Sequence, residues 1–278
     1  LPVRTAERLK EIINKHKKND VTFEIISNPE FLAEGTAIRD LFKSDRVLIG
    51  SDQTKAGHAA MESLVNIYKR WIPKERIIKT NIWSSELSKL ASNAMLAQRI
   101  SSINSLSALT EKTEAKINEL SLAIGKDHRI GDKFLNASPG FGGSCFKKDI
   151  LNLVYICRQY GLEEVAEYWH QVVKINDYQR KRIFNIVNSS LVELKNKKIS
   201  ILGWSFKKDT NDTRESSAIP IASDLIINGA SLQIYDPLAE KKQIIQDITT
   251  YLESKNLVPK EIKSFLGQVK IQSTLSEC

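Results

Sequence analysis

One cysteine in a glycine-rich segment is the residue of this chain best suited to covalent chemistry. Residues 139–149 read PGFGGSCFKKD, in which the Cys145 thiol follows three glycines and precedes two lysines. Glycines let the backbone approach a ligand closely and adopt positive φ. Residues 149–155 predict a helix, and a helix N-terminus beside Lys147 or Lys148 favours the nucleophilic thiolate. The segment therefore indicates an active-site nucleophile; the alternative is a glycine-rich turn with a small buried cysteine.

Length and composition bound the class of protein. The 278 residues suffice for two domains of ordinary size, and 41% hydrophobic residues can build real cores. No run approaches the roughly 18 to 20 apolar residues of a membrane span, and no signal-peptide core follows the first residues. Three cysteines without a C-x-x-C pair argue against a disulfide framework, and four scattered histidines give little support for a metal site. We therefore expect a cytoplasmic protein without a membrane segment or a metal ion.

The excess of basic residues could suit a polyanion. Lysine and arginine number 41 against 33 acidic residues, which gives a formal net charge of +8. The basic clusters at residues 15–18, 180–182 and 195–198 are short and lack interleaved aromatic residues. We therefore expect no nucleic-acid partner, whereas a phosphorylated small substrate fits the charge.

Helices and strands alternate before the cysteine. Apolar residues at helical spacing predict an amphipathic helix over residues 3–18, and β-rich residues 21–26 predict a strand that stops at the Asn28-Pro29 turn signal. The pattern then predicts a strand over 46–50, a helix over 56–68 and a strand over 77–80. Such alternation implies a parallel sheet with crossovers.

A helical block follows. Ser84 or Ser85 can cap a long helix, which runs from Glu86 for about 28 residues because apolar positions recur at helical spacing. Further helices are predicted over 117–124, ended by Gly125, over 149–160 and, after a break at Gly161, over 162–194. Long helices with small residues on several faces often pack against a second copy, so we expect a dimer interface here.

A second α/β unit begins near residue 197. It is predicted to consist of a strand over 199–203, a polar loop over 204–214, a helix over 216–228 and a strand over 231–237. This order is the outline of a mononucleotide-binding βαβ unit. The first turn has one glycine where G-x-G-x-x-G has three, which argues against a dinucleotide pyrophosphate there. Its lysines suit a phosphate or a uracil-type base instead, and we expect this sheet to be incomplete within the chain.

Four segments in this order carry a resemblance to an enzyme family. They are residues 28–35 (NPEFLAEG), 86–94 (ELSKLASNA), 142–149 (GGSCFKKD) and 206–216 (FKKDTNDTRES). Together they resemble the UDP-glucose/GDP-mannose dehydrogenase family, and within it the UDP-glucose 6-dehydrogenases of eukaryotic type. The resemblance covers essentially the whole chain, and long motifs at compatible spacing are far more specific than any one of them.

The resemblance implies an α/β fold in three parts. Residues 1–82 would be the remnant of a Rossmann-like NAD-binding domain, residues 83–194 a central all-helical dimerisation domain with the catalytic cysteine loop, and residues 195–278 the first part of a second Rossmann-like domain that binds the UDP-sugar. Because the family begins with a glycine fingerprint upstream of this segment, the chain would be an internal fragment and inactive by itself.

The reaction implied is the NAD-dependent, two-step oxidation of UDP-glucose to UDP-glucuronate. In the family Cys145 would add to the aldehyde formed first, and the thiohemiacetal would be oxidised to a thioester that water releases. Lys89 would stabilise the developing oxyanion, and Asn93 would share its helix face. Asp149 would orient a water or a lysine, and Glu30 is the other candidate base.

The binding roles also follow from the resemblance. The residues expected to bind UDP-glucose are Phe31, Leu32, Ala33, Glu34, Arg129, Phe134, Leu135, Asn136, Phe141, Gly142, Phe206 and Lys207. Those expected to bind NAD are Glu34, Cys145, Lys148 and Arg214. Arg129 would be supplied to a neighbouring subunit's substrate, so that a homo-oligomer through the central helices completes the site. Asn136 stands where many relatives carry Lys, which would weaken a phosphate or ribose contact.

Two other interpretations remain open from the residues. One is a related nucleotide-sugar dehydrogenase that acts on GDP-mannose or a UDP-amino sugar; the other is a non-catalytic module for nucleotide-sugar binding or oligomerisation. Taken singly, Lys89 and Arg129 could be surface charges. Cys145, Lys89 and Asn93 together favour an enzyme, because a binding module has no use for a nucleophile, and residues 206–216 favour UDP-glucose.

Overall fold

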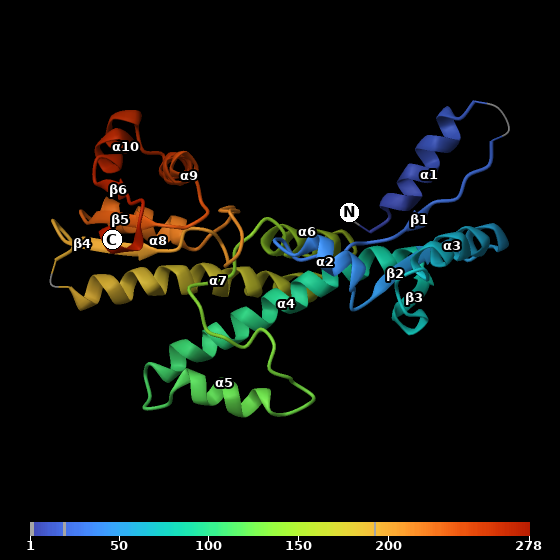
Figure 1. The fold of residues 1–278 in the computed structure, drawn as a ribbon, viewed down its shortest axis with the longest axis horizontal. Helices are drawn as coiled ribbons and strands as arrows, with labels where there is room; N and C mark the ends of the chain where they lie inside the picture. The colour runs from blue at the N-terminus through green and yellow to red at the C-terminus, as the bar shows by residue number, and fades with distance from the viewer. Residues whose placement is uncertain (1–2, 19–20, 192) are drawn as a thin grey trace. The chain divides into compact units, whose positions relative to one another are not determined.

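A long helix links two structural units of the chain. The computed structural model describes residues 3–18, 21–191 and 193–278 (Figure 1). The units are Leu1–Asn93 and Ala94–Cys278, and α4 (Ile82–Thr110) runs from the first into the second.

The first unit is built around a strand that is buried on both faces. β2 (Val47–Ser51) pairs in parallel with β3 (Ile77–Asn81) and antiparallel with β1 (Ile26–Ser27). α3 (Lys55–Tyr68) covers one face, and the core there consists of Val47, Ile49, Met61, Val65 and Ile72. The remaining elements of this unit are α1 (Thr5–His16), α2 (Ala37–Phe42) and the 3₁₀ turn η1 (Lys74–Arg76).

The strand predicted over residues 21–26 is wrong for most of its length. Residues 21–25 have no regular structure, and only Ile26 and Ser27 lie opposite β2, at Ser51 and Gly50. β-propensity alone does not make a strand, because the backbone also needs a neighbouring strand to pair with. Since this pairing is antiparallel, the sheet is mixed rather than parallel throughout.

The start of α4 differs from the prediction as well. The helix begins at Ile82, and the Asn81 side-chain oxygen accepts a hydrogen bond from the Ser84 backbone N–H at 2.8 Å. Asn81 therefore supplies the capping contact predicted for Ser84 or Ser85, which lie inside the helix.

Helices α5 to α7 follow α4 in the second unit. They are α5 (Ile117–Gly125), α6 (Phe146–Gln159) and α7 (Glu163–Ser190). Gly125 is the last helical residue and not a cap, and α7 ends earlier than predicted. The apolar core of these helices includes Ala94, Ala97, Phe141, Ile150, Val154, Cys157 and Val173. Ser101 of α4 donates a hydrogen bond to the Val172 carbonyl of α7 at 2.8 Å.

The predicted second βαβ unit is confirmed and extended by a further strand. β4 (Lys198–Leu202), β5 (Ser231–Tyr235) and β6 (Val269–Ile271) form a parallel sheet in that order. The associated helices are α8 (Ala218–Ile227), α9 (Lys241–Ser254), α10 (Pro259–Leu266) and the 3₁₀ turn η2 (Leu275–Glu277). Figure 1 shows α9 and α10 on the opposite side of this sheet from α7. A parallel sheet covered on both faces is the Rossmann-like arrangement.

Candidate active site

Cys145 occupies the position that the sequence predicted, immediately before a helix. It is the N-cap residue of α6, its side chain is exposed, and the Ser144 hydroxyl lies 3.7 Å from its sulfur. α6 begins at Phe146, three residues before the predicted start at Asp149. The thiol therefore lies at the positive end of the helix dipole.

Asp149 lies in the first turn of α6 and is buried. Only 7% of this residue is exposed, and its backbone N–H donates to the Cys145 carbonyl at 2.9 Å. The Lys148 ammonium lies 3.6 Å from the Asp149 carboxylate and is itself largely exposed. The helix start thus combines an exposed thiol, an exposed cation and a buried carboxylate.

The other two cysteines have different surroundings. Cys157 is buried in α6, and this burial raises the pKa of its thiol. Cys278 is partly buried. Because the thiolate is the nucleophilic form, Cys145 is the cysteine whose exposure and position suit covalent chemistry.

The glycines before Cys145 pack directly against the loop that follows β4. A Cβ on Gly142 would lie 2.7 Å from the Glu215 carbonyl oxygen and 2.8 Å from the Phe206 Cβ. A Cβ on Gly143, where φ is +81°, would lie 3.0 to 3.2 Å from the Phe206 ring. The Gly143 N–H donates to the Arg214 carbonyl at 2.8 Å. The glycines therefore permit both the conformation of the loop and the close approach of the two segments.

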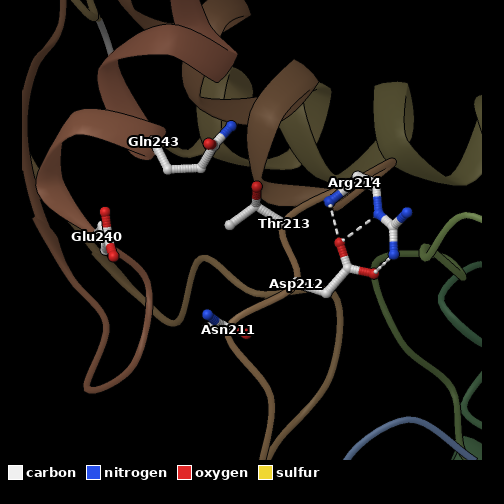
Figure 2. A pocket seen from close by; sticks show the side chains of 6 residues that line it. All are labelled: Asn211, Asp212, Thr213, Arg214, Glu240 and Gln243. Atoms are coloured by element: carbon white, nitrogen blue, oxygen red, sulfur yellow. Dashed lines mark hydrogen bonds and ion pairs between the residues drawn. The ribbon is translucent and has the colours of Figure 1, made fainter.

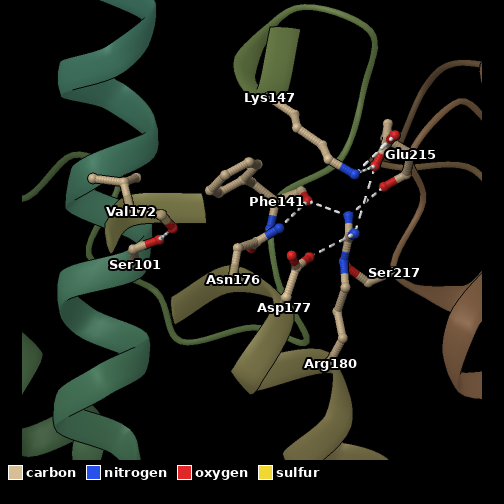
Figure 3. A network of polar contacts seen from close by, with 9 residues as sticks. All are labelled: Ser101, Phe141, Lys147, Val172, Asn176, Asp177, Arg180, Glu215 and Ser217. Atoms are coloured by element: carbon tan, nitrogen blue, oxygen red, sulfur yellow. Dashed lines mark hydrogen bonds and ion pairs between the residues drawn. The ribbon is translucent and has the colours of Figure 1, made fainter. Parts of the chain in front are cut away.

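Two polar side chains of α7 hold the same loop from the other side (Figure 3). The Asn176 amide accepts from the Phe141 N–H at 2.8 Å and donates to the Phe141 carbonyl at 3.0 Å. The Arg180 guanidinium donates to the Phe141 carbonyl at 2.9 Å, to the Glu215 carbonyl at 2.6 Å and to the Ser217 hydroxyl at 3.2 Å. Sequence reasoning missed both residues, because polar residues on a long helix usually mark a solvated face.

The loop after β4 is anchored by the aspartate at the end of β5. The Asp236 carboxylate accepts backbone N–H bonds from Trp204, Ser205, Leu238 and Ala239 at 2.6 to 2.9 Å. Burial by itself would raise the pKa of Asp236, but these N–H groups outweigh it and lower the pKa. Further along the loop, the exposed Lys207 places its ammonium 5.7 Å from the centre of the Phe206 ring.

A pocket of about 410 Å³ lies beside the end of this loop (Figure 2). It is lined by Asn211, Asp212, Thr213, Arg214, Glu240 and Gln243. Arg214 donates from Nε and Nη2 to the Asp212 carboxylate, each at 2.8 Å. The Asp212 side chain is buried whereas that of Arg214 is 64% exposed. A buried carboxylate therefore holds an exposed guanidinium in place.

Arg129 belongs to a different loop of the second unit. Its guanidinium is 78% exposed and bonds Asp127, and this hydrogen bonding lowers the pKa of the Asp127 carboxyl. Arg99 of α4 supports the loop by donating to three of its carbonyls, those of Ile130, Gly131 and Lys133 at 2.8 to 3.0 Å. Arg129 therefore points from a fixed loop into solvent.

The segment between Arg129 and the cysteine loop carries three of the predicted substrate contacts. Phe134, with φ at +61°, and Asn136 are exposed, whereas Leu135 is buried. The Ser138 N–H donates to the side chain of Asn104 at 2.8 Å, which ties the segment to α4. Phe134 and Asn136 are therefore accessible to a ligand.

In the first unit, Lys89 and Glu30 form an ion pair beside an aromatic ring. The Lys89 ammonium lies 3.0 Å from the Glu30 carboxylate and 5.6 Å from the centre of the Phe31 ring. Arg46 stacks on the same ring at 3.8 Å. The Lys89 side chain is only 19% exposed, so it is not the solvated helix lysine of the simplest interpretation. Asn93, four residues further along α4, is buried.

The other predicted residues of this unit lie on the loop after Glu30. The Leu32 N–H donates to the Glu30 carboxylate at 2.8 Å, and Ala33 and Glu34 are exposed. A pocket of about 390 Å³ adjoins this loop and is lined by Phe31, Ala33, Thr36, Arg39, Asp40, Lys43, Ser44, Asp45 and Arg46. Sequence reasoning missed Arg46, because no local pattern indicates which ring a cation will stack on.

Over the described ranges, no helix is both long and apolar enough to cross a membrane. The same residues contain no group of three or more His, Cys, Asp and Glu side chains that could hold a metal ion.

Comparison with known proteins gives concordant matches along the chain. Three models of the UDP-glucose/GDP-mannose dehydrogenase family match it: the NAD binding domain over residues 1–72, the central domain over 83–178 and the UDP binding domain over 200–268. The chain is 59% identical to UDP-glucose 6-dehydrogenase 3 of Arabidopsis thaliana over 90% of its own length and 52% of that protein. It is 54% identical to UDP-glucose 6-dehydrogenase of Drosophila melanogaster over 95% of its length and 56% of that protein. The chain thus spans about half the length of the curated relatives it matches.

A solved structure agrees with these matches. The UDP-glucose dehydrogenase of Pyrobaculum islandicum superposes with a TM-score of 0.81 at 29% identity, over 99% of this chain and 57% of that one. The NDP-N-acetyl-D-galactosaminuronic acid dehydrogenase of Methanosarcina mazei has a TM-score of 0.74 at 20% identity, which shows the same fold. With matches to all three domain models and the cysteine loop in place, the chain belongs to the UDP-glucose/GDP-mannose dehydrogenase family.

Proposed function

We propose that this chain contributes to the NAD-dependent, two-step oxidation of UDP-glucose to UDP-glucuronate, with Cys145 as the nucleophile. The observation that carries the proposal is the exposed Cys145 thiol at the N-terminus of α6, on a loop whose glycines pack against Phe206. The relatives named UDP-glucose 6-dehydrogenase, at 54 to 59% identity, support UDP-glucose as the substrate.

The thiol is required because a carboxylate is two oxidation steps above an alcohol. The first step removes a hydride from C6 and a proton from its hydroxyl and leaves an aldehyde. The Cys145 sulfur then adds to the aldehyde carbon, and the carbonyl oxygen takes up a proton to give a thiohemiacetal. Loss of a second hydride and proton gives a thioester, which water cleaves to the carboxylate and the free thiol. Each oxidation uses one hydride acceptor and the hydrolysis uses one water, so the whole sequence balances with two hydride acceptors and one water.

The hydride acceptor would be NAD⁺, which supplies the oxidising equivalent of both steps when bound. Two cationic side chains of this chain suit the negative charge of its pyrophosphate. The side chains of Lys148 and Arg214 are 71% and 64% exposed, so both are accessible to a ligand. We assign Lys148, Arg214 and Glu34 to cofactor contacts, and Cys145 to the position nearest the reacting carbon.

In the first unit, Lys89 has the properties of an oxyanion-stabilising residue. It is largely buried, and a partly buried ammonium interacts more strongly with a developing negative charge than an exposed one. Its partner Glu30 is 60% exposed and accessible to water, which suits a base in the hydrolytic step. Asn93 follows one turn later on α4, from where its amide could donate to the same oxygen. Asp149 would orient the water near the thiol.

We assign the predicted substrate contacts of each unit separately. We assign the sugar to the loop with Phe31, Leu32, Ala33 and Glu34, and UDP to Phe134, Leu135, Asn136, Phe141, Gly142, Phe206 and Lys207. We further propose a homo-oligomer through the central helices in which Arg129 reaches a neighbouring subunit's substrate; its exposure on a supported loop is consistent with that role. The boundaries 1–82, 83–194 and 195–278, and a cytoplasmic location, stay predictions.

The test is a Cys145→Ser substitution in a polypeptide that contains these residues and the family's complete NAD-binding domain. NADH formation from UDP-glucose should fall to little or none, because an alkoxide is not available at neutral pH to replace the thiolate. Cys278→Ser is the matched control and should retain full activity. If Cys145→Ser keeps most of the activity, the thiol has no covalent role. A parallel assay with GDP-mannose tests the rival specificity. Faster turnover of GDP-mannose than of UDP-glucose would overturn the assignment.

A further inference from the structure

The cysteine loop and residues 214–217 are joined by one buried arginine that the proposed chemistry does not use. Arg180 lies on α7 and is 8% exposed, yet its contacts are mostly with backbone atoms of these two segments (Figure 3). One nitrogen, Nη2, donates both to the Phe141 carbonyl and to the Glu215 carbonyl, at 2.9 and 2.6 Å. Nε donates to the Ser217 hydroxyl at 3.2 Å. A planar guanidinium can bridge separate acceptors in this way, whereas a lysine ammonium on its flexible stem cannot reproduce the fork.

The surroundings of Arg180 make the connection rigid. Asn176, which is 1% exposed, pairs both backbone polar atoms of Phe141. Glu215 has a φ of +54°. This backbone conformation is unfavourable for any residue other than glycine, and it persists only where neighbouring residues hold it. Its carboxylate lies 3.6 Å from the Arg180 guanidinium and 3.1 Å from the Lys147 ammonium. Lys147 is two residues after Cys145, so the connection extends to the start of α6.

We propose that Arg180 is a positioning residue that fixes the Cys145 loop to residues 214–217, so that the thiol and the nucleotide-binding loop keep one relative placement. The inference rests on the proposed function, because it assigns a purpose to that placement: an aldehyde on a sugar nucleotide held by Phe206 must meet the sulfur within bonding reach. Without Arg180, the carbonyls of Phe141 and Glu215 would lose a charged donor in a buried setting.

The first test is amide hydrogen exchange in the complete polypeptide, with the Gly143 amide as the reporter. The Phe141 N–H is bonded to Asn176 and the Gly143 N–H to the Arg214 carbonyl. In Arg180→Met, exchange at the Gly143 amide should rise at least about tenfold, since local opening becomes easier. Arg182→Met is the matched control, because this equally buried arginine of α7 bonds Ser107, Gln179 and Glu111 and not the cysteine loop. Unchanged exchange in Arg180→Met, or an equal rise in Arg182→Met, would overturn the inference.

The second test separates positioning from folding. For UDP-glucose oxidation, Arg180→Met should lower kcat about tenfold or more while KM changes less than about threefold, because the ligand still binds but the thiol is misplaced. Arg180→Lys should not restore kcat. If Arg180→Met does not fold, Ser217→Ala removes a single acceptor and should show the same pattern at smaller size. An unchanged kcat in a variant whose loop exchanges faster would refute the positioning role.

These readouts also distinguish the inference from the proposed function. Parent protein that does not oxidise UDP-glucose would refute the proposed function, whereas exchange at the Gly143 amide would still decide whether Arg180 holds the loop. A parent that oxidises UDP-glucose, together with unaltered exchange and kcat in Arg180→Met, refutes the inference alone.

Discussion

A Gly143→Ala substitution tests how tightly the cysteine loop is packed. Two separate costs arise at this position. The φ of +81° is unfavourable for a residue with a Cβ, by roughly 1 to 2 kcal/mol. The new methyl would also lie 3.0 to 3.2 Å from three atoms of the Phe206 ring, and overpacking typically costs about 1 to 3 kcal/mol. The sum predicts a loss of about 2 to 5 kcal/mol in the free energy of unfolding.

Two other glycines isolate the contributions. Gly161 has a φ of +71°, and no atom of the described residues lies within 4 Å of the methyl that alanine would add, so Gly161→Ala reports the backbone cost alone, about 1 to 2 kcal/mol. Gly142 has no positive φ, but its methyl would meet the Glu215 carbonyl at 2.7 Å, so Gly142→Ala reports steric overlap alone, about 1 to 3 kcal/mol. Gly143→Ala should therefore cost more than Gly161→Ala.

The assay is urea unfolding followed by tryptophan fluorescence, with the midpoint and the slope compared for each variant. A Phe206→Ala substitution in the Gly143→Ala background should recover the steric part, because the ring that the methyl meets is gone. The double-mutant coupling energy then measures the contact directly. If Gly143→Ala costs no more than Gly161→Ala and shows no coupling to Phe206, the loop does not pack on this ring and the reasoning fails.

Two further predictions concern Asp236 and Arg129. Because the folded-state pKa of Asp236 is lowered, its ionised form stabilises the fold above its unfolded pKa of about 3.9, and this contribution is lost as pH falls through the folded value. Asp236→Asn should therefore lower the urea midpoint at pH 7 and approach the parent in acid; a difference that grows in acid would contradict this sign. An Arg129→Ala variant of the complete polypeptide should be inactive alone and regain activity when mixed with a Cys145→Ser variant; absence of rescue in mixed oligomers would show that Arg129 is not shared.

The sequence was most informative where local chemistry decides the structure. The placement of Cys145 before a helix followed from the glycine run and the apolar periodicity after it, and both are local signals. The strand expected over 21–26 failed because strand formation depends on a partner, and only Ile26 and Ser27 have one. Arg180 could not be recognised, because its acceptors lie 35 to 39 residues away in the chain. A contact of that kind exists only after packing has brought the segments together.

The anchoring of the cysteine loop explains how an exposed thiol is carried on a buried backbone. Phe141, Gly142 and Gly143 are buried, whereas the Cys145 side chain two residues later is exposed. A thiol on a loose loop would lose conformational entropy each time it reached an electrophile. A loop whose backbone is fixed on two sides has already lost this entropy during folding. α7 provides one side and the loop after β4 the other. Substitutions on α7 that loosen the cysteine loop, such as Arg180→Met, should therefore affect the thiol before they affect nucleotide binding at the predicted contacts Phe206 and Lys207.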